Sequence, residues 1–565
     1  MEKKIYNEYL RWVDSVKEDE DLIKELQSIK NDESKIEDAF YRDLEFGTGG
    51  LRGVIGVGTN RMNIYVVRKA SQGLANYINA NFKNPSIAIS YDSSIKSTLF
   101  AKTAAEVFAK NNIKVFIYKE LMPTPLLSYA VRYLKCSGGI MVTASHNPSK
   151  YNGYKVYGND GCQITTNAAK AILDEINKLD VFSDPIHGDF EQFLLEGKIE
   201  YIKDIVYDSF IERVKKESLL ENETIDKNVK IIYSPLHGTG LKPVTRILKE
   251  SGYNNVIVVK EQELPDGNFT TCPYPNPEIK EAMAVGIDYA KKYDADLLIA
   301  TDPDCDRVGI AVKNNNGEHV LISGNQVGVL LLDYVCKMRI KHNKMPANPV
   351  FIKTIVTTDM GAKIADFYHV RTIDVLTGFK YIGEQILLLE KENKEGTYIL
   401  GFEESYGYLS GSYVRDKDAV DGAFLIVEMF AYYKSQGISL LDQLEKLYKQ
   451  FGHYSNYLKS YEFDGSAGFK KMNDIMNSFR NKVSNIGEFK VDKVIDYSLG
   501  IDNLPKSNVL KIYFVDGSTI VIRPSGTEPK LKIYVSLLGK DEQSNLEKKD
   551  KLFKSLEERL WTFYL

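Results

Sequence analysis

The sequence predicts an α/β protein: three similar α/β domains with mixed sheets, followed by a smaller C-terminal α+β domain. Apolar, strand-like runs alternate with helical patterns from about residue 87 to residue 400, which is typical of βαβ units. After residue 455 the pattern changes to closely spaced strands with one hairpin signal. A chain of 565 residues is also too long for one hydrophobic core, so several domains are expected.

The elements follow in order after a charged, amphipathic helical segment over residues 1–40. Apolar runs predict strands at 87–91, 114–118, 139–142, 229–233, 255–259, 296–300, 350–352, 398–400, 509–515, 518–523 and 531–535. Helices are expected over 98–110 and near 242–251, and Asp516-Gly517 is the hairpin turn. The resulting domains span 1–205, 206–325, 326–455 and 456–565.

Composition limits the class of protein. The chain is 43% apolar and 27% charged, which is typical of globular proteins, and its net charge of −4 argues against a dedicated nucleic-acid binder. Its five cysteines are scattered and form no CxxC pair, which fits a reducing compartment. No window reaches the roughly 18 apolar residues of a membrane helix, and the N-terminus lacks a secretory signal. We therefore expect a soluble, cytoplasmic protein.

Polar, glycine-rich stretches follow several predicted strands, where open parallel sheets bind ligands. In FGTGGLRG (46–53), four glycines let the backbone approach an anion, and Arg52 offers a planar fork for phosphate. The stretch matches neither a P-loop nor a dinucleotide fingerprint. It is either an anion-binding loop or a flexible turn with a surface arginine.

Ser145 lies in TASHNP (143–148), directly after an apolar strand. A hydrolase serine is disfavoured, because the GxSxG elbow is absent and the side chains of neighbours such as Ser145 and His146 seldom meet. Ser145 is therefore either a turn residue or a serine that carries something other than an acyl group.

Asp302, Asp304 and Asp306 alternate along DPDCDR, between two apolar strands. Clustered carboxylates repel one another unless a cation lies among them, and an all-oxygen set suits Mg²⁺ or Ca²⁺. An EF-hand is excluded, because Arg307 and Lys313 occupy the loop positions that need Gly and Glu. Two alternatives stay open: a surface loop of three aspartates, and a DxDxT-like phosphotransferase loop with Asp302 as the nucleophile.

Two further segments offer groups for a sugar phosphate. In GFEESYGYL (401–409), Glu403 and Ser405 either accept hydrogen bonds from sugar hydroxyls or form a solvated acidic turn. Lys380, in TGFKYIG (377–383), follows a Gly-Phe turn and could contact a phosphate.

A last candidate lies in IRPSGTEPKLKIY (522–534). The guanidinium of Arg523, two hydroxyls and the backbone N–H groups of Ser525, Gly526 and Thr527 make either a phosphate cradle or an ordinary hairpin loop.

Together with VRDKDAVDG (414–422), these motifs resemble the α-D-phosphohexomutase superfamily, in family order and over nearly the whole chain. They look most like its phosphoglucomutase branch. The resemblance implies three α/β domains and a fourth domain around a central active-site cleft. It also implies an isomerase, an intramolecular phosphotransferase that interconverts α-D-glucose 1-phosphate and glucose 6-phosphate through a phosphoserine and glucose 1,6-bisphosphate.

The resemblance implies roles for the residues around the serine. Ser145 would carry the phosphoryl group. Arg52 and Lys155 would lie beside it and assist charge and proton transfer, with Thr48 and His146 near the site.

The resemblance implies metal and substrate ligands as well. Asp302, Asp304 and Asp306 would hold one Mg²⁺, with an oxygen of phosphorylated Ser145 as a further ligand. The residues that would bind the substrate are Arg307, Lys380, Glu403, Ser405, Arg523, Ser525, Gly526 and Thr527.

The expected partner is a small phosphosugar, with no nucleic acid and no membrane, and the chain is expected to be a monomer or a homodimer. A phosphopentomutase or phosphomannomutase with the same mechanism is the alternative, although GFEES favours glucose over mannose. A non-catalytic sugar-phosphate sensor is a further alternative from another class.

Overall fold

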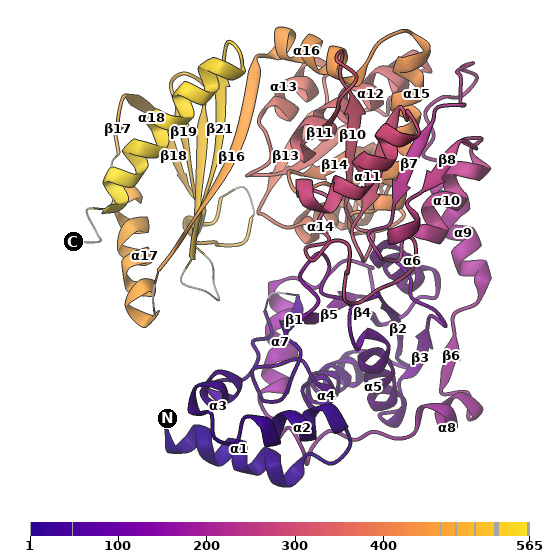
Figure 1. The fold of residues 1–565 in the computed structure, drawn as a ribbon, viewed down its shortest axis with the longest axis vertical. Coiled ribbons are helices and arrows are strands. Elements are labelled where there is room, and N and C mark those ends of the chain that lie inside the picture. The colour runs from indigo at the N-terminus through magenta and orange to yellow at the C-terminus, as the bar shows by residue number, and fades with distance from the viewer. Residues whose placement is uncertain are drawn as a thin grey trace. The chain divides into compact units, whose positions relative to one another are not determined.

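The computed structural model describes residues 2–47, 49–463, 465–480, 483–501, 504–524 and 530–561. The chain forms two compact units, and Figure 1 labels their helices and strands. Unit one comprises Met1–Ser323, Phe379–Tyr398 and Ser405–Tyr432, and unit two comprises Gly324–Gly378, Ile399–Glu404 and Tyr433–Leu565. No helix of the described ranges is long and apolar enough to cross a membrane.

The first 40 residues form three helices: α1 (Lys3–Ser15), α2 (Glu20–Ser28) and α3 (Glu33–Phe40). The breaks fall at Asp19 and Asp32, whose carboxylates accept backbone N–H groups of the helix that follows. This N-capping satisfies donors that a helix start leaves unpaired, so two short helices begin where the sequence pattern suggested one continuous segment.

The first α/β domain has a six-stranded sheet in the order β1–β5–β4–β2–β3–β6. Its strands are β1 (Gly50–Val54), β2 (Ser86–Tyr91), β3 (Lys114–Ile117), β4 (Gly138–Val142), β5 (Tyr151–Gly158) and β6 (Ile199–Tyr201). Its helices are α4 (Ile64–Asn81), α5 (Ser97–Lys110), α6 (Thr124–Tyr133), α7 (Thr166–Ile176), α8 (Phe190–Leu195) and α9 (Asp204–Lys215). Strands β4, β2, β3 and β6 are parallel, whereas β5 and β1 run antiparallel to their neighbours, so the sheet is mixed.

The second domain has a five-stranded sheet in the order β11–β10–β9–β7–β8. Its elements are β7 (Ile231–Ser234), α10 (Leu241–Glu250), β8 (Val256–Val258), η1 (Lys260–Gln262), α11 (Lys280–Lys292), β9 (Leu297–Thr301), β10 (Val308–Lys313) and β11 (His319–Ile322). Strands β8, β7 and β9 are parallel, and β10 turns back antiparallel to β9. The β9–β10 turn carries the aspartate motif.

The third domain has a four-stranded sheet in the order β13–β12–β14–β15. Its elements are α12 (Gly324–Lys341), β12 (Val350–Thr354), α13 (Met360–Phe367), β13 (Arg371–Val375), α14 (Phe379–Lys391), η2 (Glu395–Thr397), β14 (Tyr398–Glu403), β15 (Gly407–Leu409), α15 (Ala419–Ser435) and α16 (Leu440–Phe451).

The C-terminal domain has a six-stranded sheet in the order β16–β21–β20–β19–β18–β17. Its elements are β16 (His453–Glu462), α17 (Gly465–Arg480), β17 (Asn485–Ile486), β18 (Phe489–Asp496), η3 (Tyr497–Leu499), β19 (Leu510–Phe514), β20 (Thr519–Pro524), β21 (Lys530–Gly539) and α18 (Glu542–Trp561). One apolar core joins α17 and α18 to β19, β20 and β21. The predicted fold class, three α/β domains with mixed sheets and a C-terminal domain, is confirmed.

Unit two contains a cluster of charged side chains around two buried lysines. Lys353 Nζ, on β12, lies 3.1 Å from Asp359 Oδ1 and 3.0 Å from Asp374 Oδ1. Lys511 Nζ, on β19 of the C-terminal domain, lies 2.9 Å from the same Asp359 oxygen. Thr519, on β20, donates to Asp359 Oδ2. Asp359 therefore links strands of the third and fourth domains.

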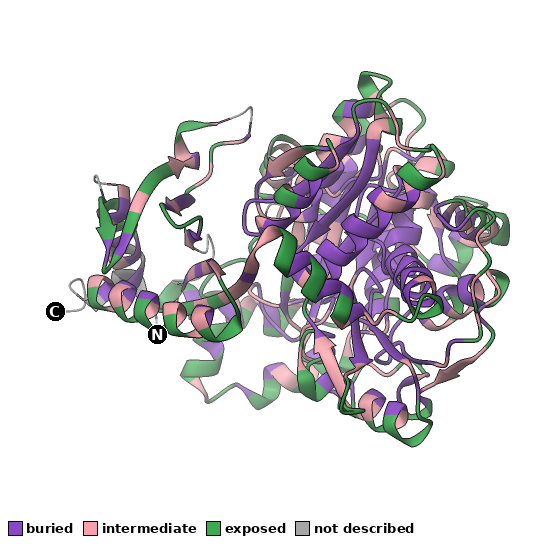
Figure 2. Cartoon of the chain, turned by 90° about the horizontal axis from the view of Figure 1, so that it is seen from above, coloured by how far each residue is buried: buried purple, intermediate pink, exposed green. Residues whose placement is uncertain are grey.

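The central strands are buried on both faces. Every residue of β4, β9 and β12 is buried, and Figure 2 shows exposed residues gathered on helices and loops. Strands covered on both sides appear in the sequence as continuous apolar runs, which is why they could be located from the sequence.

Trp12 anchors the N-terminal helices to the first domain. Its side chain is fully buried, and its ring meets the rings of Phe40, Tyr65 and Phe182 edge-on, with centroids 5.2–5.7 Å apart. Edge-on aromatic contacts of this kind add to the stability gained by burial alone.

Replacing Trp12 by Ala should lower the free energy of unfolding by about 3–5 kcal/mol, because a large aromatic side chain leaves a cavity. Urea unfolding followed by circular dichroism measures the loss. Tyr6→Ala on the same helix is the control, since Tyr6 is 41% exposed and its removal should cost little. Equal unfolding midpoints for the two variants would contradict this role of Trp12.

Candidate functional site

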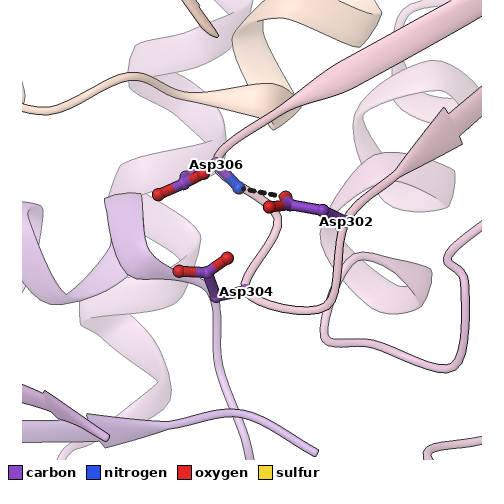
Figure 3. Close-up of side chains that lie close together, drawn as sticks. All are labelled: Asp302, Asp304 and Asp306. Carbon is purple, nitrogen blue, oxygen red and sulfur yellow. Dashed lines mark hydrogen bonds between the residues drawn. The ribbon is translucent and has the colours of Figure 1, made fainter. Parts of the chain in front are cut away.

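Three fully buried carboxylates form the centre of the candidate site. Asp302, Asp304 and Asp306 lie on the turn between β9 and β10, and one ligand oxygen of each lies within 4.8 Å of the others. Figure 3 shows the three side chains around this turn. Asp302 Oδ1 accepts the backbone N–H groups of Asp306 and Arg307, at 3.1 and 3.0 Å, which fixes the turn. The alternative of a surface loop is therefore wrong.

Two lysines balance part of this negative charge. Lys155 Nζ lies 2.8 Å from Asp304 Oδ2 and 3.3 Å from Asp306 Oδ2, and Lys417 Nζ lies 2.8 Å from Asp306 Oδ2. Burial opposes ionisation of Asp306, but Lys417, Lys155 and Arg307 outweigh it and hold its pKa below the usual range.

Asp302 has the opposite environment. Burial, together with the neighbouring charges of Asp304 and Asp306, raises its pKa well above the usual range. The two ends of one short turn therefore differ in electrostatic environment, because Lys155 and Lys417 pair with Asp304 and Asp306.

The carboxylates also have the chemistry of a site for a hard cation. Asp304 Oδ1 and Asp306 Oδ1 are buried and accept no hydrogen bond from the described residues. A buried carboxylate oxygen without a partner is costly, and a divalent ion among oxygen ligands removes that cost. The three aspartates therefore fit Mg²⁺ or a similar ion.

Ser145 lies beside this cluster, on the turn after β4. Its Oγ donates to Asp302 Oδ2 at 3.1 Å, although more than 150 positions separate the two residues. The expectation that the side chains of Ser145 and His146 do not meet is wrong, because Ser145 Oγ lies 3.1 Å from His146 Nδ1. Ser145 has a φ of +55°, which turns the chain sharply between the two side chains.

This contact does not make a hydrolase triad. The same nitrogen, His146 Nδ1, faces Ser145 and lies 4.0 Å from Asp302, whereas a triad uses opposite ring nitrogens. Burial and the cations Arg307 and Arg52 hold the pKa of His146 well below its usual value. His146 is therefore neutral near pH 7.

Lys155 and Arg52 come from an antiparallel ribbon of β1 and β5. Lys155 pairs with Gly50, and Arg52 pairs with Gly153, so both side chains lie on one face of the ribbon. A Cβ at Gly50, where φ is +139°, would lie 1.9 Å from the carbonyl oxygen of Tyr154. The second half of FGTGGLRG (46–53), a stretch predicted as a loop, therefore lies in strand β1. Thr48 lies outside the described residues.

The substrate-binding candidates fall in both units. In unit one, Arg307 Nη1 lies 3.4 Å from Glu278 Oε1, Lys380 is the second residue of α14, and Ser405 is half-buried in the turn after β14. In unit two, Glu403 is buried at the end of β14, and half-buried Arg523 pairs with Lys532 across β20 and β21. Ser525, Gly526 and Thr527 lie outside the described residues.

The sequence prediction gave no role to Lys417, although Lys417 lies in the motif VRDKDAVDG (414–422). Lys417 also lies 3.3 Å from Asp416, whose other oxygen accepts the hydroxyl of Tyr157 at 2.7 Å. A lysine among several aspartates in a buried segment was the available signal. Thr124 was also missed; its hydroxyl donates to Asp304 Oδ2 at 2.9 Å, and nothing in its sequence context marked it.

Comparison with known proteins gives matches along most of the chain. Models of the phosphoglucomutase/phosphomannomutase family match in order: α/β/α domain I over residues 43–181, domain II over 208–317, domain III over 323–451 and the C-terminal domain over 470–547. A phosphoglucomutase of Staphylococcus epidermidis is 37% identical over 540 residues, covering 93% of this chain and 96% of the relative. One of Staphylococcus aureus is 38% identical, covering 88% and 90%.

Solved structures share the fold. The open form of the Paramecium exocytosis-sensitive phosphoprotein pp63/parafusin, a phosphoglucomutase, matches with a TM-score of 0.69 at 18% identity, covering 93% of this chain and 96% of that one. A phosphoglucomutase/phosphomannomutase family protein of Burkholderia thailandensis matches with a TM-score of 0.67 at 17% identity, covering 91% and 97%. With four family domains in order and 37% identity over 93% of its length, the chain belongs to the phosphoglucomutase/phosphomannomutase family.

Proposed function

We propose that this chain is an isomerase, an intramolecular phosphotransferase that interconverts α-D-glucose 1-phosphate and glucose 6-phosphate. The observation that carries the proposal is the contact of Ser145 Oγ with a buried aspartate cluster that is only partly balanced by lysines. A serine in that position suits a carrier of phosphate, because positive charge can be gathered around it. The relatives named phosphoglucomutase support glucose phosphates as the substrates.

Asp302, Asp304 and Asp306 would hold one Mg²⁺, with a phosphoserine oxygen as a further ligand. Two buried oxygens that accept no hydrogen bond from the described residues, Asp304 Oδ1 and Asp306 Oδ1, support this assignment. When bound, such an ion supplies positive charge next to the phosphoryl oxygens.

Residues of the chain would carry out the phosphoryl and proton transfers. Ser145 gives its phosphoryl group to a free sugar hydroxyl: the bond from phosphorus to Ser145 Oγ breaks, and a bond to the sugar oxygen forms. The bisphosphorylated sugar then reverses its orientation, and its other phosphate returns to Ser145. The proton of the sugar hydroxyl ends on Ser145 Oγ, whose bond to phosphorus has broken. Lys155 would assist that transfer, and Arg52, on the same face of the ribbon, would hold phosphoryl oxygens.

Substrate recognition would use residues of several motifs. Arg307 and Lys380 would contact a phosphate, and Glu403 and Ser405 would bind sugar hydroxyls. Arg523, together with Ser525, Gly526 and Thr527, would grip the phosphate that is not reacting. Exclusion of water from the reacting groups would protect the phosphoserine from hydrolysis.

Ser145→Ala should lower turnover by roughly 10⁴-fold or more, because it removes the group that carries the phosphate. A coupled assay that reports glucose 6-phosphate measures the loss, and an unchanged circular dichroism melt shows that the fold is intact. Mass spectrometry of the phosphorylated wild type should place the phosphate on Ser145. Activity near that of the wild type, or phosphate on Asp302, would show that the assigned mechanism is wrong.

Adding Mg²⁺ to chelator-treated protein should raise its melting temperature, because an ion at one hundred times its Kd stabilises the folded state by about 2.7 kcal/mol. Asp304→Asn should abolish this shift. Asp294→Asn is the control, since Asp294 is 85% exposed and pairs with Lys313 outside the cluster. If Mg²⁺ leaves the melting temperature of the wild type unchanged, the metal assignment fails.

Glucose phosphates should give the highest kcat/KM in a panel that also contains mannose, ribose and glucosamine phosphates. Glu403→Gln should lower kcat/KM for glucose 1-phosphate by roughly 10- to 100-fold, since a hydrogen bond from a sugar hydroxyl to a carboxylate is lost. A preference for mannose or ribose phosphates would favour a phosphomannomutase or phosphopentomutase. Mg²⁺-dependent turnover of any member of the panel rules out a non-catalytic sensor.

A further inference from the structure

We infer that Asp92 and Thr143 are positioning residues for Ser145: a buried carboxylate, acting through one hydroxyl, fixes the backbone turn that aims Ser145 Oγ at Asp302. The inference deepens the proposed function and rests on it, because Ser145 is the reacting residue in that proposal.

The turn at Ser145 needs such support. Its φ of +55° lies in the left-handed region, which residues other than glycine keep only where their surroundings hold them. The backbone N–H of Ser145 donates to Thr143 Oγ1 at 2.6 Å. Since the backbone angles set the direction of the Cα–Cβ bond, this hydrogen bond also sets where Oγ points. That direction brings Ser145 Oγ to 3.1 Å from Asp302 Oδ2.

The oxygen and the proton of the Thr143 hydroxyl each take part in one hydrogen bond. Its oxygen accepts from Ser145, and its single proton goes to Asp92 Oδ2 at 2.5 Å. Thr143 is fully buried, so water does not compete for either bond. Donation to a charged acceptor strengthens the oxygen as an acceptor in turn, so Asp92 reinforces the bond that holds Ser145.

The sheet puts the two residues side by side. Tyr91 of β2 pairs with Val142 of β4 in a parallel ladder, and Asp92 and Thr143 are the next residues along each strand. The backbone N–H of Asp92 donates to the carbonyl of Val142, which extends the ladder by one bond. The contact between Asp92 and Thr143 therefore follows from strand register.

The rest of the Asp92 carboxylate is also occupied. It is 2% exposed and accepts the N–H and hydroxyl of Ser94 at 2.8 and 3.0 Å and the hydroxyl of Ser97 at 2.9 Å. With Thr143, four donors converge on one carboxylate. Each oxygen accepts from two of these donors, so an asparagine in place of Asp92 would turn an NH₂ group toward two of them, and the geometry calls for the acid.

Asp92→Asn and Thr143→Val each remove part of this connection, whereas Thr143→Ser keeps the hydroxyl. For the first two variants we expect kcat to fall about 10- to 100-fold, since a displaced nucleophile loses alignment with the phosphoryl group. KM for glucose 1-phosphate should change by less than about twofold, and Thr143→Ser should restore most of kcat. The coupled mutase assay on folded, purified protein measures these values.

Ser90→Ala is the matched control. Ser90 lies on β2, two residues before Asp92, is fully buried, and donates one hydrogen bond to the carbonyl of Met122 at 2.9 Å. The Ser90→Ala variant loses a buried hydroxyl but keeps the hydrogen bonds around Ser145, so its kcat should stay near that of the wild type. If Thr143→Val or Asp92→Asn also kept the wild-type kcat, the inference would be wrong while the proposed function stood.

Hydrogen exchange separates this inference from the proposed function. The peptide that contains the Ser145 amide should exchange faster in Asp92→Asn and Thr143→Val than in the wild type or Ser90→Ala, because its hydrogen bond to Thr143 is weakened or lost. This readout does not depend on turnover. Unchanged exchange in both variants would overturn the positioning role, whereas a wild type without mutase activity would overturn the proposed function alone. If one variant fails to fold, the other decides.

Discussion

Confining three carboxylates to one buried turn is the constraint around which the site is organised. Asp302, Asp304 and Asp306 have no exposed surface, and mutual repulsion at such short range is severe in a poorly solvated interior. Lys155 and Lys417 offset this repulsion only in part, because both approach the side of Asp304 and Asp306. The negative charge that the two lysines leave unbalanced attracts a cation to the position next to Ser145.

The surrounding fold can be understood as the framework that holds these charges in place. Antiparallel pairing of β1 with β5 puts Lys155 opposite a glycine, and parallel pairing of β2 with β4 puts Asp92 beside Thr143. In unit two, Asp359 takes a similar part by joining lysines of the third and fourth domains. For Asp92 and Thr143, the strand register fixes a polar contact that side-chain chemistry alone leaves undetermined.

The sequence was sufficient for much of the fold, because strands covered on both faces leave continuous apolar runs. It was less informative for β1 and β5, which are glycine-rich and polar, so their pairing was not anticipated. The aspartate turn was found from its spacing, since Asp302, Asp304 and Asp306 are neighbours in the chain. Lys417 and Thr124 reach the cluster through tertiary packing; only the aspartates beside Lys417 in the sequence gave a local signal, and Thr124 had none. The contact between Ser145 and His146 depended on a left-handed φ that the residue type does not signal.

The chain order of the two lysines has a consequence for how the protein is made. Lys155 precedes the aspartate turn, but Lys417 follows it by more than a hundred residues. During synthesis, N-terminal domains fold first, so the acidic turn forms while only one of its lysines exists. A nascent chain released before residue 417 would carry an overcharged pocket and lose the stability that the second lysine provides. Completion of the acidic pocket is therefore postponed until the ribosome has made most of the third domain.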